Sequence, residues 1–408
     1  MMKLTILDNG LRVASRTMPG IETVAVGLYA DTGARHEPAR VNGIAHLFEH
    51  MVFKGAGGRS ARELSEAIED VGGDLNACTD REGTNFTAAL LADQLPLGIE
   101  LLSDMVLRPH FDGEDLAREK EVVLQELGEA RDTPSDIIFD DLWAAAYPDQ
   151  PLGRSVLGEE ESIAAITADD LHDWRLGQYR AASLSLVAAG KVDHAALVRH
   201  AEKRFAGLPL GTIDPPEPAR FAGGVRSCAV RADQAHLAIA YRAPALLEPG
   251  YYPARLFSDL VGSGASSRLF QAVREERGLA YSVWSSLQPY RDGSTFYFYA
   301  ATARREAAAA ARLIAEVVAD AARTATPREL DRAVAQAKAG LLMSLETSWG
   351  QAAYVARQLS LHGRLVEPRE VVRDLEAVTL DALKTEAAAM LAGPRASATI
   401  GFPAVRAA

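Results

Sequence analysis

Two histidines and a glutamate lie close together in the segment "NGIAHLFEHMVFKG", which contains the pattern His-x-x-Glu-His. On a helix, His46 and His50 share one face because they are four residues apart, so both imidazoles can approach a single ion. Glu49 directly precedes the second histidine and would lie beside the same point. Neutral imidazole favours zinc, and catalytic zinc keeps one coordination position open for water. The spacing therefore predicts a zinc site with a carboxylate that could act as a general base.

A third metal ligand could come from the helix predicted over "EDLAREKEVVLQELGEARD". Glu119 and Glu126 are seven residues apart, nearly two helical turns, so both carboxylates could point toward one site. Three further acidic residues, Glu114, Glu121 and Glu129, lie nearby, and a solvated acidic face is the more common explanation of such a segment. Spacing alone does not select Glu126.

The composition of the whole chain is that of an ordinary globular protein. A chain of 408 residues exceeds what one hydrophobic core usually organises, and 48% apolar with 24% charged residues is typical of folded domains. The formal charge of −12 argues against a nucleic-acid or anionic-membrane partner. The two cysteines, Cys78 and Cys228, are too few for a disulfide framework. Since neither an export signal nor a membrane-spanning apolar run is evident, we expect a cytoplasmic protein.

The order of the predicted elements repeats once along the chain. Residues 1–207 begin with strands and continue with the His-x-x-Glu-His helix, a second helix and two further strands. A long helical region from Leu95 to about Arg131 closes this set of elements. Residues 208–224 are rich in Pro and Gly and read as a linker. Residues 225–408 repeat this order, and their last strand of the set leads into a long Ala-rich helix. Only the first copy carries the histidines.

The strand-like segments come in hairpin order, and the first pair is joined by an Asn-Gly turn at residues 9–10. Helices fall between and after them. We therefore predict an α+β protein with two homologous domains from an internal duplication, each a mostly antiparallel sheet covered by helices.

The segments "HLFEHMVFKG", "GGDLNACTDREGTNF", "EKEVVLQELGEARDTP", "YPDQPLGRSVLG" and "SSRLFQAVREERGLAYSV" follow one another in an order that resembles the pitrilysin-type zinc peptidases, family M16. The chain most resembles the M16B subfamily, which includes the mitochondrial processing peptidase beta subunit and bacterial homologues. The inverted zinc motif is the most specific part of a resemblance that covers nearly the whole chain. It implies one zinc ion per chain, held by His46, His50 and Glu126, with Glu49 as the general base.

The same resemblance implies roles for residues elsewhere. Glu119 matches an acidic residue that supports the catalytic water or orients a ligand. Asn76 and Ala77 lie on "GGDLNACTD", which would pair with an extended substrate backbone, although a plain hairpin strand is the alternative. In the second half, Arg274 and Tyr281 match a pair that holds the substrate and steadies the reaction intermediate.

We therefore expect a zinc metalloendopeptidase that hydrolyses extended or unfolded peptides inside a closed chamber, with water activated by Glu49. Some relatives divide the metal residues and the Arg-Tyr pair between different subunits, whereas this chain carries both sets, so we expect a homodimer with two equivalent sites. The acidic balance of the chain favours basic peptide substrates. Two alternatives are a non-catalytic scaffold subunit of the same fold and a peptidase that trims one precursor peptide. The intact motif favours the enzyme, whereas the cleavage preference and the need for a distinct partner subunit stay open.

Overall fold

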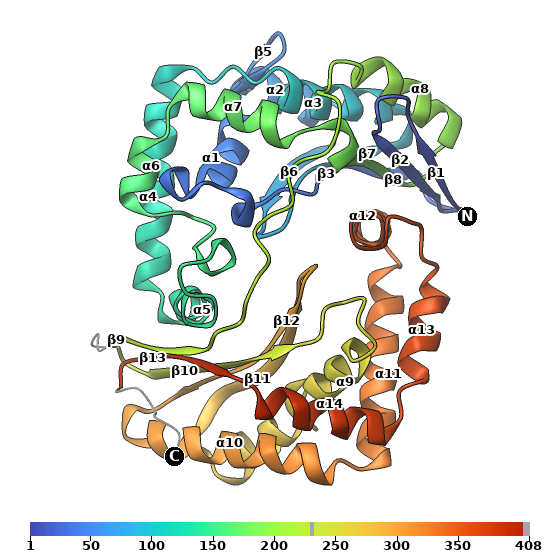
Figure 1. Ribbon diagram of the computed structural model, residues 1–408. Helices are drawn as coiled ribbons and strands as arrows, with labels where there is room; N and C mark the ends of the chain where they lie inside the picture. The colour runs from blue at the N-terminus through green and yellow to red at the C-terminus, as the bar shows by residue number, and fades with distance from the viewer. Residues whose placement is uncertain (229–231, 403–408) are drawn as a thin grey trace. The chain divides into compact units, whose positions relative to one another are not determined.

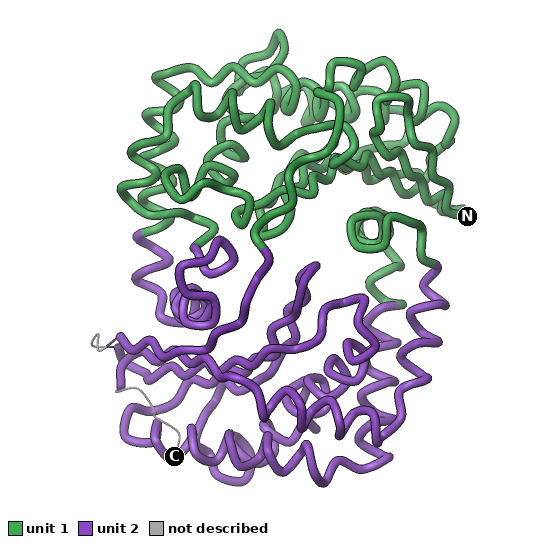
Figure 2. The backbone as a smooth tube through the Cα atoms, in the orientation of Figure 1, with its two compact units in different colours: residues 1–127, 155–217, 342–366 green, residues 128–154, 218–341, 367–408 purple. Residues whose placement is uncertain are grey.

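The computed structural model describes residues 1–228 and 232–402, which form two compact units. Figure 2 shows that the units interleave along the chain. Unit 1 contains residues 1–127, 155–217 and 342–366, and unit 2 contains residues 128–154, 218–341 and the remainder from residue 367. Among the described residues, no helix is long and apolar enough to cross a membrane. The division of the sequence into two repeats, residues 1–207 and 225–408, joined by a linker at 208–224, stays a proposal. The last six residues of the second repeat lie outside the described ranges.

Unit 1 is built on a six-stranded sheet with the order β1-β2-β8-β3-β7-β6 (Figure 1). Neighbouring strands run antiparallel except for β2 and β8, which are parallel. The strands are β1 (Met2–Ile6), β2 (Arg12–Thr17), β3 (Thr23–Ala30), β6 (Asp74–Thr79), β7 (Thr84–Leu91) and β8 (Leu184–Gly190). The predicted Asn-Gly hairpin is confirmed, because Gly10 adopts a φ of 96° between β1 and β2, a conformation that glycine tolerates.

The helices of unit 1 pack mainly on one face of this sheet. They are α1 (Ile44–Met51), α2 (Ala61–Glu69), α3 (Leu95–Leu107), α4 (Gly113–Asp132, which continues into unit 2), α6 (Glu160–Ala165), α7 (Ala168–Gln178) and α8 (His194–Arg204). A short ribbon, β4 (Gly55–Ala56) with β5 (Arg59–Ser60), lies between α1 and α2.

The helical region predicted from Leu95 to about Arg131 is two helices, α3 and α4, rather than one. Pro109 disfavours the helical conformation at the preceding residue, and Arg108 accordingly leaves it with φ −138° and ψ 42°. Phe111 then adopts a φ of 51° and packs edge-on against Phe48 of α1, with ring centroids 5.6 Å apart. The break ends the helix that packs on the sheet and lets α4 begin beside α1.

Unit 2 repeats the sheet of unit 1 without its first strand. The order is β11-β12-β10-β13-β9, and β13 and β9 form a parallel pair as β8 and β2 do. The strands are β9 (Gly224–Cys228), β10 (Ala235–Ala243), β11 (Ala280–Pro289), β12 (Ser294–Thr302) and β13 (Arg395–Ile400). Because order and pairing directions match strand for strand, the predicted duplication is confirmed.

The helices of unit 2 occupy places along the chain similar to those of unit 1. They are α9 (Tyr251–Gly262), a π-helical turn (Phe270–Glu276), α10 (Ala307–Thr324), α11 (Pro327–Ser344), α13 (Pro368–Glu376) and α14 (Leu380–Ala392). Helix α9 follows β10 as α1 follows β3, and α10 follows β12 as α3 follows β7.

Each half of the sequence supplies one helix to the unit built mainly from the other half. Helix α5 (Pro134–Ala146) packs on β10 and β13 of unit 2, and α12 (Ser348–His362) packs on β2, β3 and β8 of unit 1. Side chains alternate along each strand, so both sheet faces need apolar partners. In unit 1, Val24 and Val26 face the main helix layer, whereas Ala25 and Val187 face Val355 and Leu359 of α12.

This packing predicts that Leu359→Ala destabilises unit 1. The Leu359 side chain is fully buried in the apolar cluster between α12 and the sheet, so its truncation should cost about 2–5 kcal/mol in the free energy of unfolding. Denaturant unfolding gives the stability, and hydrogen exchange resolved by segment should locate the loss in unit 1. The exposed Met343, at 67% exposure, gives the matched control, and Met343→Ala should change stability by less than about 0.5 kcal/mol. Equal stabilities of the two variants would contradict this role of α12.

Candidate metal centre

Helix α1 presents the predicted motif residues from a buried setting. Its apolar side, which includes Leu47, Phe48 and Met51, is completely buried, and Phe48 stacks on Tyr179 with ring centroids 4.7 Å apart. His46 and His50 lie on the opposite, partly exposed side, with 14% and 18% of their side chains accessible. The apolar packing thus determines which side of a two-turn helix carries the imidazoles.

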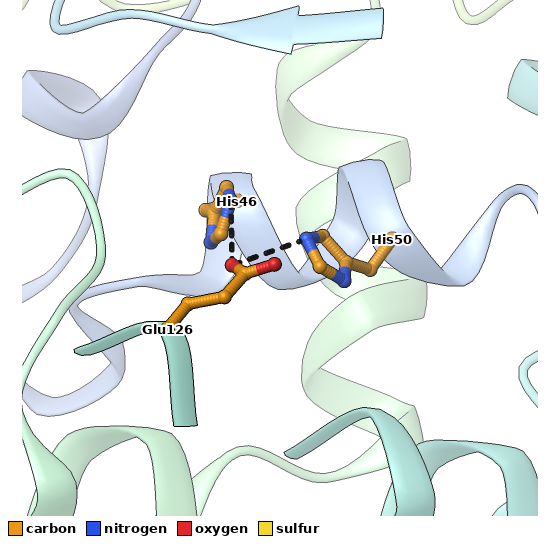
Figure 3. A group of neighbouring side chains, drawn as sticks. All are labelled: His46, His50 and Glu126. Carbon is orange, nitrogen blue, oxygen red and sulfur yellow. Dashed lines mark ion pairs between the residues drawn. The ribbon is translucent and has the colours of Figure 1, made fainter. Parts of the chain in front are cut away.

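Glu126 of α4 points toward both imidazoles (Figure 3). Its Oε2 lies 3.7 Å from Nε2 of His46 and 3.6 Å from Nε2 of His50. One candidate ligand atom from each of the three side chains falls within 4.8 Å of the others. Two imidazoles and a carboxylate are the donor set of many catalytic zinc sites. The structure therefore brings Glu126 to the two histidines, a link that the sequence could make only through a resemblance.

Glu119 contacts the other nitrogen of His50. Its Oε2 lies 3.1 Å from His50 Nδ1, and its Oε1 lies 2.7 Å from Lys54 Nζ. The Glu119 side chain is buried, with 6% of the residue accessible. This arrangement lets the Nδ1–H group of His50 donate a hydrogen bond to a carboxylate oxygen, which leaves the Nε2 lone pair free. Glu119 and Glu126 thus occupy different places, although they share one face of α4.

The electrostatics of His46 suit metal binding. Burial, with a smaller contribution from neighbouring His50, lowers the pKa of His46 to about 4. The imidazole is therefore neutral at pH 7 and has no proton to lose before it binds an ion. Its Nδ1 is buried without a hydrogen-bond partner. The donor set and the protonation state both fit a zinc ion.

Glu49 lies beside the histidines without being one of the three grouped ligands. Burial raises the pKa of the Glu49 carboxyl, and hydrogen bonding from Thr79 at the end of β6 opposes part of this rise. Its Oε2 is buried and has no hydrogen-bond partner. A carboxylate with a raised pKa is a stronger base, and one free oxygen leaves an acceptor for a proton.

Strand β6, which contains most of "GGDLNACTD", lies at the edge of the unit 1 sheet. An edge position is what pairing with an extended substrate backbone would require. Asn76 is exposed, whereas Ala77 is partly buried and packs against the core. Thr79, at the end of the strand, contacts α1, where its Oγ1 lies 3.5 Å from the Ala45 carbonyl oxygen. The edge strand therefore ends beside the motif helix.

Arg274 and Tyr281 belong to unit 2 and contact each other. The Arg274 guanidinium carbon lies 4.2 Å from the centre of the Tyr281 ring and 4.6 Å from that of Phe270. Arg274 Nη1 also donates a 3.0 Å hydrogen bond to the Tyr281 carbonyl oxygen. The Tyr281 side chain is largely exposed, at 77%. The two residues form a cation–π pair that is open to solvent.

Sequence reasoning missed Lys54 and Thr79. Lys54 follows His50 by four residues, a spacing that could have associated it with the histidine side of the helix. Thr79 gave no such signal, because its contact with Glu49 depends on how β6 pairs with β7 and ends beside α1.

Two sequence profiles match this chain and together cover most of it. The profile for insulinase, peptidase family M16, matches residues 12–160, and the profile for the peptidase M16 inactive domain matches residues 165–337. The first match contains all residues of the candidate metal centre, and the second contains Arg274 and Tyr281.

Relatives with similar sequences extend over nearly the full length. An uncharacterized zinc protease of Mycobacterium tuberculosis is 33% identical, over 97% of this chain and 92% of its own. One from Rickettsia felis is 31% identical, over 97% and 96%. The mitochondrial-processing peptidase subunit beta of Lentinula edodes is 32% identical, over 94% and 86%.

Solved structures with similar folds extend over both units. The peptidase M16 inactive domain from Pseudomonas fluorescens has a TM-score of 0.92 at 20% identity and covers 100% of this chain and 99% of its own. A protease from Helicobacter pylori has a TM-score of 0.91 at 21% identity and covers 98% and 99%.

Proposed function

Because the chain belongs to peptidase family M16, we propose that it is a zinc-dependent endopeptidase that cleaves extended or unfolded peptides. The observation that carries the proposal is the convergence of His46, His50 and Glu126, with the base Glu49 beside them. A non-catalytic scaffold has no need for two imidazoles, a third ligand and a base at one place.

His46, His50 and Glu126 would hold the zinc ion through two imidazole nitrogens and one carboxylate oxygen. When bound there, zinc would supply Lewis-acid polarisation of the scissile carbonyl and increase the acidity of a water molecule. The remaining chemistry falls to side chains of this chain.

Glu49 would move the proton. Its free carboxylate oxygen accepts a proton from the attacking water as the water oxygen bonds to the carbonyl carbon. The protonated carboxyl group then delivers that proton to the amide nitrogen as the carbon–nitrogen bond breaks. The products are a new carboxyl group and a new amine, and Glu49 returns to its starting state.

Glu119 would act through His50 rather than on the water. By accepting a hydrogen bond from the Nδ1–H group, Glu119 holds the ring so that Nε2 faces Glu126, and Lys54 compensates the charge of the buried carboxylate. The interpretation as a ligand-orienting residue is thus the better supported of the two that the sequence allowed.

The substrate backbone would pair with β6, with Asn76 and Ala77 at the contact, since an edge strand offers unpaired backbone groups. Arg274 and Tyr281 would hold the peptide through a cationic and an aromatic group. The homodimer, the closed chamber, the preference for basic peptides and the cytoplasmic location stay predictions.

Zinc content and cleavage of a quenched peptide library by the purified protein test this function together. We expect about one zinc per chain, and cleavage that stops with a chelator and returns with zinc. Zinc without cleavage would instead favour a missing partner subunit or a single precursor substrate. Absence of both would support the scaffold alternative.

Glu119→Ala should lower zinc affinity by about 10–100-fold, because partners that orient a ligand histidine typically contribute that much. Competition with a chelator measures the affinity. Glu121→Ala, which truncates an exposed glutamate on the same helix, should bind zinc like the wild type. If Glu119→Ala kept its zinc affinity and lost only turnover, Glu119 would instead act on the reacting water.

A further inference from the structure

Helix α1 begins without a capping side chain of its own. Its N-cap residue is Gly43, which has no side chain and a φ of 95°. Elsewhere in the described residues, helices are capped by the side chain of their own N-cap residue, for example Ser60 for α2, Thr167 for α7 and Asp193 for α8. The helix that carries the metal motif therefore needs acceptors from elsewhere for its first N–H groups.

The position of Gly43 has no room for a capping side chain such as that of serine or threonine. A Cβ at this position would lie 2.8 Å from the Leu157 carbonyl oxygen and 3.1 Å from Gly158 Cα, and its left-handed backbone conformation disfavours other residues. A serine or threonine cap is thus excluded by the close approach of the 157–158 segment.

Glu37, six residues before Gly43, supplies the missing acceptors. Its Oε1 accepts a 2.8 Å hydrogen bond from the Ala45 N–H, and its Oε2 accepts one of 2.8 Å from the Gly43 N–H. Oε2 also accepts a 2.6 Å bond from Asn42 Nδ2. Glu37 is buried, with 3% of the residue accessible. The negative charge stands at the positive end of the helix dipole, which stabilises it.

The cap is also tied to a neighbouring segment. Asn42 Nδ2 donates a second bond, of 3.0 Å, to the Ser155 carbonyl oxygen, and Ser162 Oγ donates one of 2.7 Å to the Asn42 carbonyl oxygen. A buried carboxylate is costly unless its oxygens are hydrogen-bonded, and both oxygens of Glu37 are. The two oxygens of Glu37 thus hold the backbone N–H groups of Gly43 and Ala45 at the start of the helix.

We propose that Glu37 is a positioning residue of the metal centre, an inference that rests on the proposed zinc peptidase function. Helix α1 has only eight residues, and a helix this short does not hold its geometry by itself. His46 follows the capped N–H of Ala45 directly, and His50 follows one turn later. A shift of the helix start by one residue would turn both rings by about 100°. Glu37 fixes that start and so the convergence of the two Nε2 atoms on Glu126.

Glu37→Gln tests this inference, because it keeps the size of the side chain but places an NH₂ group against N–H donors. We expect the metal-free variant to keep its far-UV circular dichroism, its zinc affinity to fall by about 10–100-fold, and the visible absorption spectrum of the Co²⁺-loaded protein to change. Glu63→Gln is the matched control. Glu63 Oε2 accepts from the Ser60 N–H at 2.8 Å at the start of α2, which carries no motif residue. This control should match the wild type in zinc affinity and in Co²⁺ spectrum.

A folded Glu37→Gln protein with wild-type zinc affinity and Co²⁺ spectrum would overturn the inference while leaving the proposed function intact. A wild-type protein that binds neither metal would overturn the proposed function, and this inference with it. If Glu37→Gln does not fold, Asn42→Ala decides, because it removes one donor and leaves both backbone bonds to the carboxylate. Asn42→Ala should lose zinc affinity several-fold with a changed Co²⁺ spectrum, and wild-type values would contradict the role of Glu37.

Discussion

Glu49→Gln should bind zinc as tightly as the wild type and lose about 10²–10⁴-fold in kcat, the usual contribution of a general base. Glutamine has the size of glutamate but cannot take up a proton. Glu49 is not one of the three grouped ligand atoms, so the change leaves the metal-binding set intact. Metal analysis of the purified protein gives the zinc content, and cleavage of a quenched peptide gives kcat.

The pH profile adds a second measurement for the same residue. Because burial raises the pKa of Glu49, the carboxylate becomes protonated at a higher pH than an exposed glutamate does. A protonated Glu49 cannot accept a proton, so kcat of the wild type should fall as the pH drops through this raised pKa. The residual activity of Glu49→Gln should lack that acid limb. Glu69→Gln, at an exposed position on α2, is the control and should keep both activity and profile.

An active Glu49→Gln protein would contradict the proposed mechanism, because another group would then move the proton. A variant that lost zinc together with activity would instead place Glu49 among the groups that hold the metal.

Glu126→Ala should lose zinc and activity together. The change removes one of three ligand side chains, so the loss in zinc affinity should exceed the roughly 10–100-fold expected for a group that only orients a ligand. Chelator competition measures the affinity, and peptide cleavage at saturating zinc measures what activity returns. The order of affinities should be wild type, then Glu119→Ala, then Glu126→Ala.

Glu121→Ala is again the matched control, since Glu121 lies on the same helix but is exposed. It should bind zinc and cleave peptides like the wild type. A Glu126→Ala protein with undiminished zinc affinity would show that the third ligand comes from elsewhere and would contradict the proposed site.

Much of the fold was predictable from the sequence because the signals are local. The Asn-Gly turn, the alternating strands and the repeated element order follow from backbone preferences and from side-chain periodicity, and the structure confirms the two homologous α+β domains. The exchange of α5 and α12 was not predictable. Both helices have an apolar side, and nothing local indicates which of two similar sheets that side will cover.

The sequence by itself determined that His46, Glu49 and His50 lie together, because their spacing on one helix fixes it. It also placed Glu119 and Glu126 on one face of a second helix. Only the tertiary structure decided between them. Seven residues span about 10 Å of helix axis, so two glutamates on one face cannot occupy the same point beside the histidines. The packing of α4 against α1 brings Glu126 to both Nε2 atoms and Glu119 to the far nitrogen of His50.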